Sequence, residues 1–216
     1  MSEDDHYLYI DKSNLDKLVG KLLQHNQIYA PTKFNDRSYL EEISLKNLDK
    51  MDISGFRAVE PFKMFLFKLI EKVSKYFGAD EMTHEKNMVF FGMRACDLEA
   101  LEVLDKVLAE GEFTDPFYTA SRSKVLVIGA DCTSCGNTCF CTLVKGLPYP
   151  SKLFDISLSP VNGGYIVAIG SEKGKKLISE NLELFESANR SRAEEMNKNR
   201  KNMVAMVDDR NRKFFF

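Results

Sequence analysis

The chain has 216 residues, 44% of them hydrophobic, and its 30 basic and 32 acidic side chains give a net charge of −2. A chain of this size and composition buries enough apolar surface to fold without disulfides. The nearly balanced charge argues against a general electrostatic attraction to nucleic acid or anionic lipid, so we expect any partner to be a protein.

Hydrophobic periodicity predicts two helices and a short strand in the first third of the chain. Leucine and valine residues three and four positions apart predict an amphipathic helix over residues 12–25, with Ser13 as its N-cap. Residues 28–30 lead into a proline, which holds the residue before it out of the helical conformation and predicts an extended segment. A second amphipathic helix is predicted over residues 62–77, ending at Gly78, with an aromatic face that we expect in the core.

Two apolar runs predict buried strands that each lead to cysteine. The first covers residues 88–91 and is closed by Gly92, and the second covers residues 125–129. Asp97 is the expected N-cap of a helix that packs through leucines and ends at Gly111. The cysteine before this cap therefore lies at a strand-to-helix turn, at the edge of an α/β sheet where sites tend to be built.

The last third predicts a hairpin and a helical end. Residues 154–158 and 165–169 flank an Asn-Gly-Gly sequence, and we expect antiparallel strands joined by a loop longer than two residues. A helix is predicted from Ser171 to Phe185. We therefore predict an α/β (or α+β) domain over residues 1–185, with a mixed sheet flanked by helices and a cysteine-rich loop at the strand ends, followed by a charged helical or partly disordered tail over residues 186–216.

The ends and the cysteine content of the sequence predict a cytoplasmic protein. The first residues are acidic where a secretory signal needs a basic start and an apolar core. The longest apolar stretch, residues 61–70, is interrupted by two lysines and is shorter than the ~20 residues of a membrane-spanning helix. Five cysteines without an export signal indicate a reducing compartment, where clustered thiols serve as ligands or catalysts rather than as disulfides.

Four of the five cysteines form a C-x2-C-x3-C-x-C cluster, namely Cys132, Cys135, Cys139 and Cys141, and Cys96 lies upstream. Thiolates are the ligands of zinc, copper(I) and iron–sulfur clusters, and such sites recruit four of them. The small polar residues between them let the backbone fold around a metal and donate N–H groups to sulfur.

Three alternatives to an iron–sulfur cluster follow from the same residues. The spacing differs from the paired C-x2-C turns of a zinc ribbon, but a structural zinc site for docking partners stays open. Individual cysteines can also be small buried apolar residues, or a pair can form a reversible redox disulfide. The histidines are remote from the cysteines and no nucleophile motif is present, so no catalytic residue is predicted.

Three sequence elements carry a resemblance to a known group of proteins: Gly92-Met-Arg94-Ala-Cys96-Asp97-Leu98, Asp115-Pro-Phe-Tyr118 with Ser121-Arg122, and Asp131-Cys132 followed by Thr138-Cys139-Phe140-Cys141. They resemble the iron–sulfur electron-transfer subunits that include the beta subunit of soluble nickel–iron hydrogenases (sulfhydrogenases) and the corresponding subunit of anaerobic sulfite reductase. The resemblance extends more loosely over most of the chain.

The resemblance implies that Cys96, Cys132, Cys139 and Cys141 share one [4Fe-4S] cluster, with Cys135 an additional thiol that the family pattern does not require. Its partners would be other oxidoreductase subunits or a ferredoxin-like electron carrier. Arg94 is a candidate cofactor-binding residue that offsets the cluster's negative charge or donates to its sulfur; the alternative is a surface ion pair with a nearby acidic side chain.

One departure from the family pattern concerns the C-terminal end. Family members usually continue into a ferredoxin-like region with two C-x2-C-x2-C-x3-C-P motifs, whereas no cysteine follows Cys141 here. We therefore expect either a part of a longer chain or a short relative that lacks this relay. The expected function is that of an electron-transfer subunit or domain of a hydrogenase-like or sulfite-reductase-like oxidoreductase, and the alternative is a zinc-binding interaction module.

Overall fold

The computed structural model describes residues 7–66 and 87–212. In chain order the elements are β1 (Leu8–Asp11), α1 (Lys12–Leu22), β2 (Asn26–Phe34), β3 (Arg37–Ile43), η1 (Leu48–Lys50), η2 (Phe62–Phe65), β4 (Asn87–Met93), α2 (Ala95–Leu108), α3 (Pro116–Ser123), β5 (Val125–Ala130), η3 (Cys141–Val144), β6 (Ile156–Val161), β7 (Gly164–Ile169), α4 (Glu172–Ser179), η4 (Leu182–Leu184), β8 (Glu186–Ser187) and α5 (Arg190–Asn211), where η marks a 3₁₀ helix.

The strands form one mixed sheet in the order β3-β2-β4-β5-β6-β7-β1-β8. Strands β2, β4, β5 and β6 run parallel to one another at its centre. Strand β3 pairs antiparallel at one edge, and β7, β1 and β8 pair antiparallel at the other. This mixed sheet with helices around it confirms the predicted α/β class.

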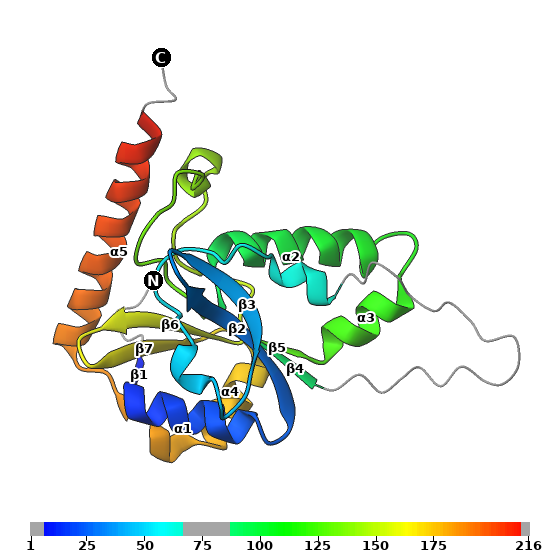
Figure 1. Cartoon of the computed structure of the whole chain (residues 1–216), viewed down its shortest axis with the longest axis horizontal. Coiled ribbons are helices and arrows are strands. Elements are labelled where there is room, and N and C mark those ends of the chain that lie inside the picture. The colour runs from blue at the N-terminus through cyan, green and yellow to red at the C-terminus, as the bar shows by residue number, and fades with distance from the viewer. Residues whose placement is uncertain (1–6, 67–86, 213–216) are drawn as a thin grey trace, which may run out of the picture.

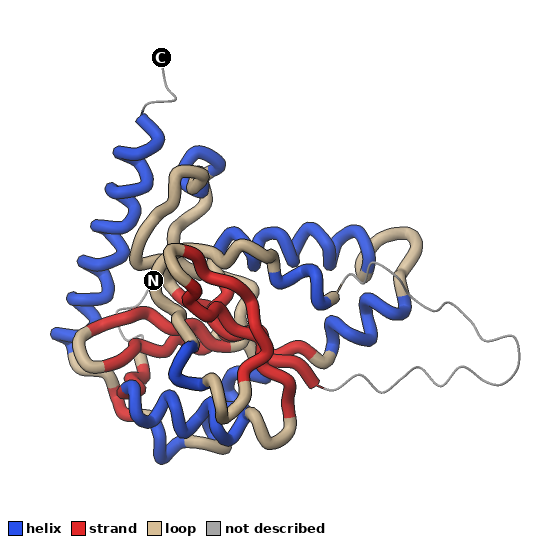
Figure 2. Tube along the Cα trace, viewed as in Figure 1, coloured by secondary structure: helices blue, strands red, loops and turns tan. Residues whose placement is uncertain are grey.

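Helices cover both faces of the sheet (Figures 1 and 2), and the central strands are buried on both sides. In β4, Phe90 packs toward α2 and α3, whereas its neighbours Val89 and Phe91 pack toward α1 and α4. All three are fully buried, as are Val127 and Ile128 in β5, which confirms that the two apolar runs are buried parallel strands.

The bounds of two predicted elements differ from expectation. Helix α1 is capped by Asp11, whose carboxylate accepts the N–H of Asn14, so Ser13 is already helical. Strand β4 does not end at Gly92 but continues to Met93 through a bulge in which Gly92 has a φ of 80°. A side chain there would meet Ile53 Cγ2 at 3.0 Å, so both the left-handed backbone and the close approach favour glycine.

The predicted hairpin is present, but its loop is tighter than expected. Val161 of β6 pairs with Gly164 of β7, so Asn162 and Gly163 alone form the turn. Strand β3 was not predicted, because its sequence alternates only weakly at the exposed edge of the sheet. Of the helix expected over residues 62–77, the structure describes the 3₁₀ helix η2 at its start, and residues 67–77 lie outside the described part.

The charged end of the sequence forms the long helix α5, which confirms the predicted C-terminal helix. Before it, β8 pairs with β1, so the first residues of the predicted tail belong to the sheet. The domain boundary at residue 185 stays a prediction. Among the described helices, none combines the length and the apolar character that crossing a membrane requires.

Candidate metal centre

The candidate site forms where β4 and β5 end side by side. The two strands are parallel neighbours, with Met93 paired to Gly129, so the residues that follow them meet at one edge of the sheet. Arg94 follows β4 and Asp131 follows β5, and the Arg94 Nη1 donates to the Asp131 carbonyl oxygen at 2.6 Å. The prediction that two strands deliver cysteine-bearing segments to one place is confirmed.

Arg94 is buried at this junction, with only 1% of its surface exposed. Its Nη2 donates to the carbonyl oxygens of Ile53 (2.8 Å) and Ser54 (3.1 Å), while its Nε is buried without a hydrogen-bond partner in the described part of the chain. The alternative of a surface ion pair is therefore wrong, because Arg94 is a buried cation that ties three segments together. Its role in binding a cofactor stays a prediction.

Cys96 lies inside the first turn of α2 rather than before the helix. The helix begins at Ala95 with Arg94 as its N-cap, and the Arg94 carbonyl accepts the N–H groups of Asp97 and Leu98. Asp97 is therefore not the N-cap, because β4 passes into the helix without a separate loop. The position still places the sulfur near the positive end of the helix dipole, which favours a thiolate.

The segment after β5 is held by its backbone against neighbouring loops. The Cys132 N–H donates to the Pro148 carbonyl at 2.9 Å, and the Thr133 N–H donates to the Gly55 carbonyl at 3.0 Å. The Gly136 N–H donates to the Cys139 sulfur at 3.2 Å, which confirms that this loop directs backbone N–H groups at sulfur. Any Cβ at Gly136 would approach the Phe56 ring to 2.8 Å, so the loop packs closely on residues 55–56.

The thiols of this region lie within electrostatic range of one another. Desolvation, followed by Asp97 and the Cys132 thiol, raises the pKa of Cys96 to about 12, although part of the residue is solvent-exposed. Burial raises the pKa of Cys132 to about 12, with Cys139 and Cys141 adding to the rise and Arg94 opposing it. Burial and the Cys139 thiol also raise the pKa of Cys141.

The raised pKa values bear on the reactivity of the thiols. The five cysteines are all free, and Cys135 lies half-buried in the same loop. Reactive cysteines have lowered pKa values, so the raised values make Cys96 and Cys132 less reactive than ordinary cysteines, and the redox-switch alternative stays a prediction. Within residues 7–66 and 87–212, no three His, Cys, Asp or Glu side chains are already grouped closely enough to hold a metal ion.

Two arginines that sequence reasoning did not single out act on the site. Burial raises the pKa of both Cys96 and Asp97, and the charge of Arg57, in the loop that follows Ile53, opposes that rise. Arg200 of α5 pairs with the buried Asp131 through Nε (2.7 Å) and Nη2 (3.2 Å). No local pattern marks either residue, because Arg57 lies in an irregular loop and Arg200 in a run of charged residues.

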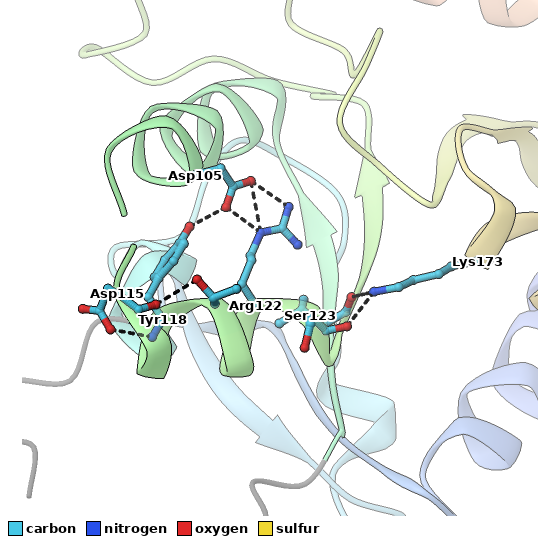
Figure 3. A network of polar contacts seen from close by, with 8 residues as sticks. Asp105, Asp115, Tyr118, Arg122, Ser123 and Lys173 are labelled. Carbon is cyan, nitrogen blue, oxygen red and sulfur yellow. Dashed lines mark hydrogen bonds and ion pairs between the residues drawn. The ribbon is translucent and has the colours of Figure 1, made fainter. Parts of the chain in front are cut away.

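The Asp115–Arg122 element of the resemblance connects α2 to α3 (Figure 3). Asp115 caps α3, the Tyr118 hydroxyl donates to Asp105 Oδ1 at 2.6 Å, and Arg122 forks onto the same carboxylate at 3.1 Å. Asp105 lies in the last turns of α2, whereas Cys96 lies in its first. This element therefore fixes the direction of the helix that carries Cys96.

Comparison with known proteins gives one informative match. The chain is 25% identical over 182 residues to the sulfhydrogenase 2 subunit beta of Pyrococcus furiosus, which covers 83% of this chain and 53% of that protein. The chain thus spans about half the length of the curated relative that it matches. No protein-family model matches the chain.

Proposed function

We propose that this chain is an electron-transfer subunit or domain of a hydrogenase-like oxidoreductase, holding one [4Fe-4S] cluster on Cys96, Cys132, Cys139 and Cys141. The observation that supports the proposal is that the segments bearing these thiols follow two neighbouring parallel strands, with the thiols within range of one another's charge. The similarity to a sulfhydrogenase beta subunit supports the oxidoreductase role.

The surroundings of the thiols fit such a group. Thiolates are the protein ligands of iron–sulfur clusters, and a bound cluster would accept and release single electrons. Four thiolates on a [4Fe-4S] core would leave a net negative charge, because the sulfides already offset most of the iron charge. The buried Arg94 guanidinium and the N-terminal end of α2 would both oppose that charge. The Gly136 N–H bond to the Cys139 sulfur is of the kind that raises a cluster's reduction potential.

The chain's own residues then have distinct tasks. Cys132, Cys139 and Cys141 come from the loop after β5 and Cys96 from the first turn of α2, so binding would join the helix that follows β4 to the segment after β5. Each bound thiol must give up its proton, and the raised pKa values mean that loading becomes more favourable as the pH rises. Partners of the assembly are proposed to be other oxidoreductase subunits or a ferredoxin-like carrier in the cytoplasm.

The test is purification without oxygen, followed by iron and acid-labile sulfide analysis and EPR of the reduced protein. We expect about four iron and four sulfide per chain. Replacing Cys96, Cys132, Cys139 or Cys141 by serine, one at a time, should abolish or convert the signal. The matched control Cys135→Ser, from the same loop, should leave it unchanged.

Two outcomes would contradict the proposal. One zinc per chain without sulfide would establish the structural interaction module instead. Loss of the cluster on Cys135→Ser with retention on Cys96→Ser would overturn the ligand assignment.

A further inference from the structure

We infer that helix α5 is the brace that holds the cysteine loop, residues 131–146, in position beside the end of β4 so that its thiols can converge on one ligand, with Arg200 and Arg210 as positioning residues. The inference rests on the proposed function only for the identity of the group that the thiols bind. Figure 1 shows the loop standing beside the C-terminal half of α5.

Arg200 fixes the start of the loop. Its guanidinium forks onto the Asp131 carboxylate, donates to Ser159 Oγ at 2.9 Å and lies 4.4 Å from the centre of the Tyr149 ring. Asp131 is 5% exposed and directly precedes Cys132. The ion pair with Arg200 therefore fixes the position of the backbone from which the Cys132 thiol projects. A bidentate pair of this kind fixes orientation as well as distance.

The end of α5 reaches the middle and the far side of the same loop. Arg210 Nη1 donates to Asn137 Oδ1, between the second and third loop cysteines. Asn211 Nδ2 donates to Thr142 Oγ1 at 3.5 Å, directly after Cys141. One helix therefore contacts the loop before its first cysteine, between its cysteines and after its last.

The other end of α5 is anchored on the sheet, which makes it a fixed support. Met196 is buried with Tyr9, Val161 and Ile166 on the β1–β6–β7 side. Toward the loop, a pocket of about 390 Å³ is lined by α5 on one side and by Cys132 and Tyr149 on the other. Met203 and Val207 are buried on the same face of α5, so the polar contacts of Arg200, Arg210 and Asn211 add directional fixation of the loop to this apolar packing.

The test measures convergence of thiols without any native metal. Phenylarsine oxide condenses with two neighbouring thiols, forming two As–S bonds and releasing one water, so its affinity for the reduced protein reports whether the thiols meet. The protein carries Cys135→Ser, which removes the fifth thiol. Arg200→Met should weaken binding roughly tenfold or more, because it leaves a buried carboxylate unpaired next to Cys132, and Arg200→Lys should restore part of it.

The controls separate positioning from folding. Arg190→Met is the matched control, since Arg190 lies on the same helix and pairs only with Glu194 by the contacts described, and it should bind the arsenical like the parent. Arg210→Met and Asn137→Ala remove an exposed contact and should each weaken binding roughly two- to fivefold, within the range of a single charge-assisted hydrogen bond, at an unchanged urea midpoint. If Arg200→Met does not fold, the arsenical affinities of Arg210→Met and Asn137→Ala test the inference in its place.

Parental affinity in Arg200→Met and Arg210→Met, both folded, would overturn the inference, as would a parent that binds no arsenical. Failure of the proposed function gives a different result. If the parent protein binds the arsenical but contains no iron and sulfide, the role of α5 is supported and the [4Fe-4S] proposal is contradicted.

Discussion

At the residue scale, the site depends on which hydrogen-bond partners a few buried polar side chains find. Arg94 is the clearest case, because its guanidinium donates to carbonyl oxygens of Ile53, Ser54 and Asp131, on two segments far apart in the sequence. A buried cation is tolerated where several acceptors replace its water. Arg94 thus holds the segments around the site together whether or not a cofactor is bound.

Replacing Arg94 by methionine should lower the free energy of unfolding by about 3 kcal/mol, because buried carbonyl oxygens lose their donors. Urea unfolding followed by circular dichroism measures the change. The control Arg37→Met removes an exposed arginine at the start of β3 and should stay within ~0.5 kcal/mol of the parent. Equal stability of the two variants would show that the hydrogen bonds of Arg94 contribute nothing.

The raised thiol pKa values give a prediction about reactivity. In the reduced, metal-free protein at pH 8, Cys96 and Cys132 should react with iodoacetamide roughly 30-fold more slowly than ordinary cysteines, since a higher pKa reduces the thiolate fraction more than it raises nucleophilicity. The rate should climb as the pH rises from 9 toward 12. Mass spectrometry of alkylated peptides measures it, with protein unfolded in urea as control.

The same pKa shifts predict how the free energy of unfolding changes with pH. Because the folded pKa values of Cys96 and Cys132 lie above the unfolded value of 9.0, their contribution is complete below pH 9 and is lost as the pH rises through about 12. Thiols that react at pH 8 as fast in the folded as in the unfolded protein would contradict both statements.

At the element scale, helix α2 connects the site to a structural clamp. Its first turn carries Cys96 and its last turns carry Asp105, which accepts from Tyr118 and Arg122 of α3 (Figure 3). Burial, and then the Asp105 carboxylate, raise the pKa of the Tyr118 hydroxyl, so it remains a hydrogen-bond donor at neutral pH. The contacts of the Asp115–Arg122 element therefore go to helix α2 and not to the thiols.

Arg122→Leu should cost about 1–2 kcal/mol of unfolding free energy, because a partly buried pair is lost. Metal content per folded chain should not change, since the clamp lies at the other end of α2. Thermal unfolding and metal analysis on the same sample test this, with Glu110→Gln, an exposed residue just past the helix, as the control. A variant with parental stability and reduced metal content would place the clamp in the site.

At the scale of the whole molecule, the core and the candidate site are built from different parts. The apolar layers on the two sheet faces draw on the strands and helices, whereas the cysteine loop fills the connection between the parallel strands β5 and β6. Such a connection is usually a helix, and a long irregular one is most often functional. The fold should therefore persist without metal.

Hydrogen exchange tests this separation. In metal-free protein, amides of β4 and β5 should keep their protection, while those of residues 132–146 should exchange faster than in the loaded protein, because that loop is held by few backbone bonds. The double variant Cys96→Ser, Cys132→Ser serves as a form that cannot load. Loss of protection throughout the sheet would show that the metal is needed for the fold itself.

The sequence by itself determined the features that depend on local pattern. The apolar runs at residues 88–91 and 125–129 specify buried strands because every residue in them is apolar, and both strands are present and adjacent. The cysteine spacing identified the loop, and the charged helical end was predicted from composition. The assignment of the four ligands comes from the resemblance and stays a prediction.

Only the tertiary structure decided how distant segments meet. Burial of Arg94, the approach of the loop around Ile53 and the pairing of Arg200 with Asp131 each join residues about 40 to 70 positions apart, and side-chain hydrogen bonds of that range leave no periodicity to detect. The same reason explains the wrong cap at Asp97 and the bulge at Gly92. Both depend on β4 passing into α2 against a neighbouring strand, which is a property of the packed sheet and not of either segment alone.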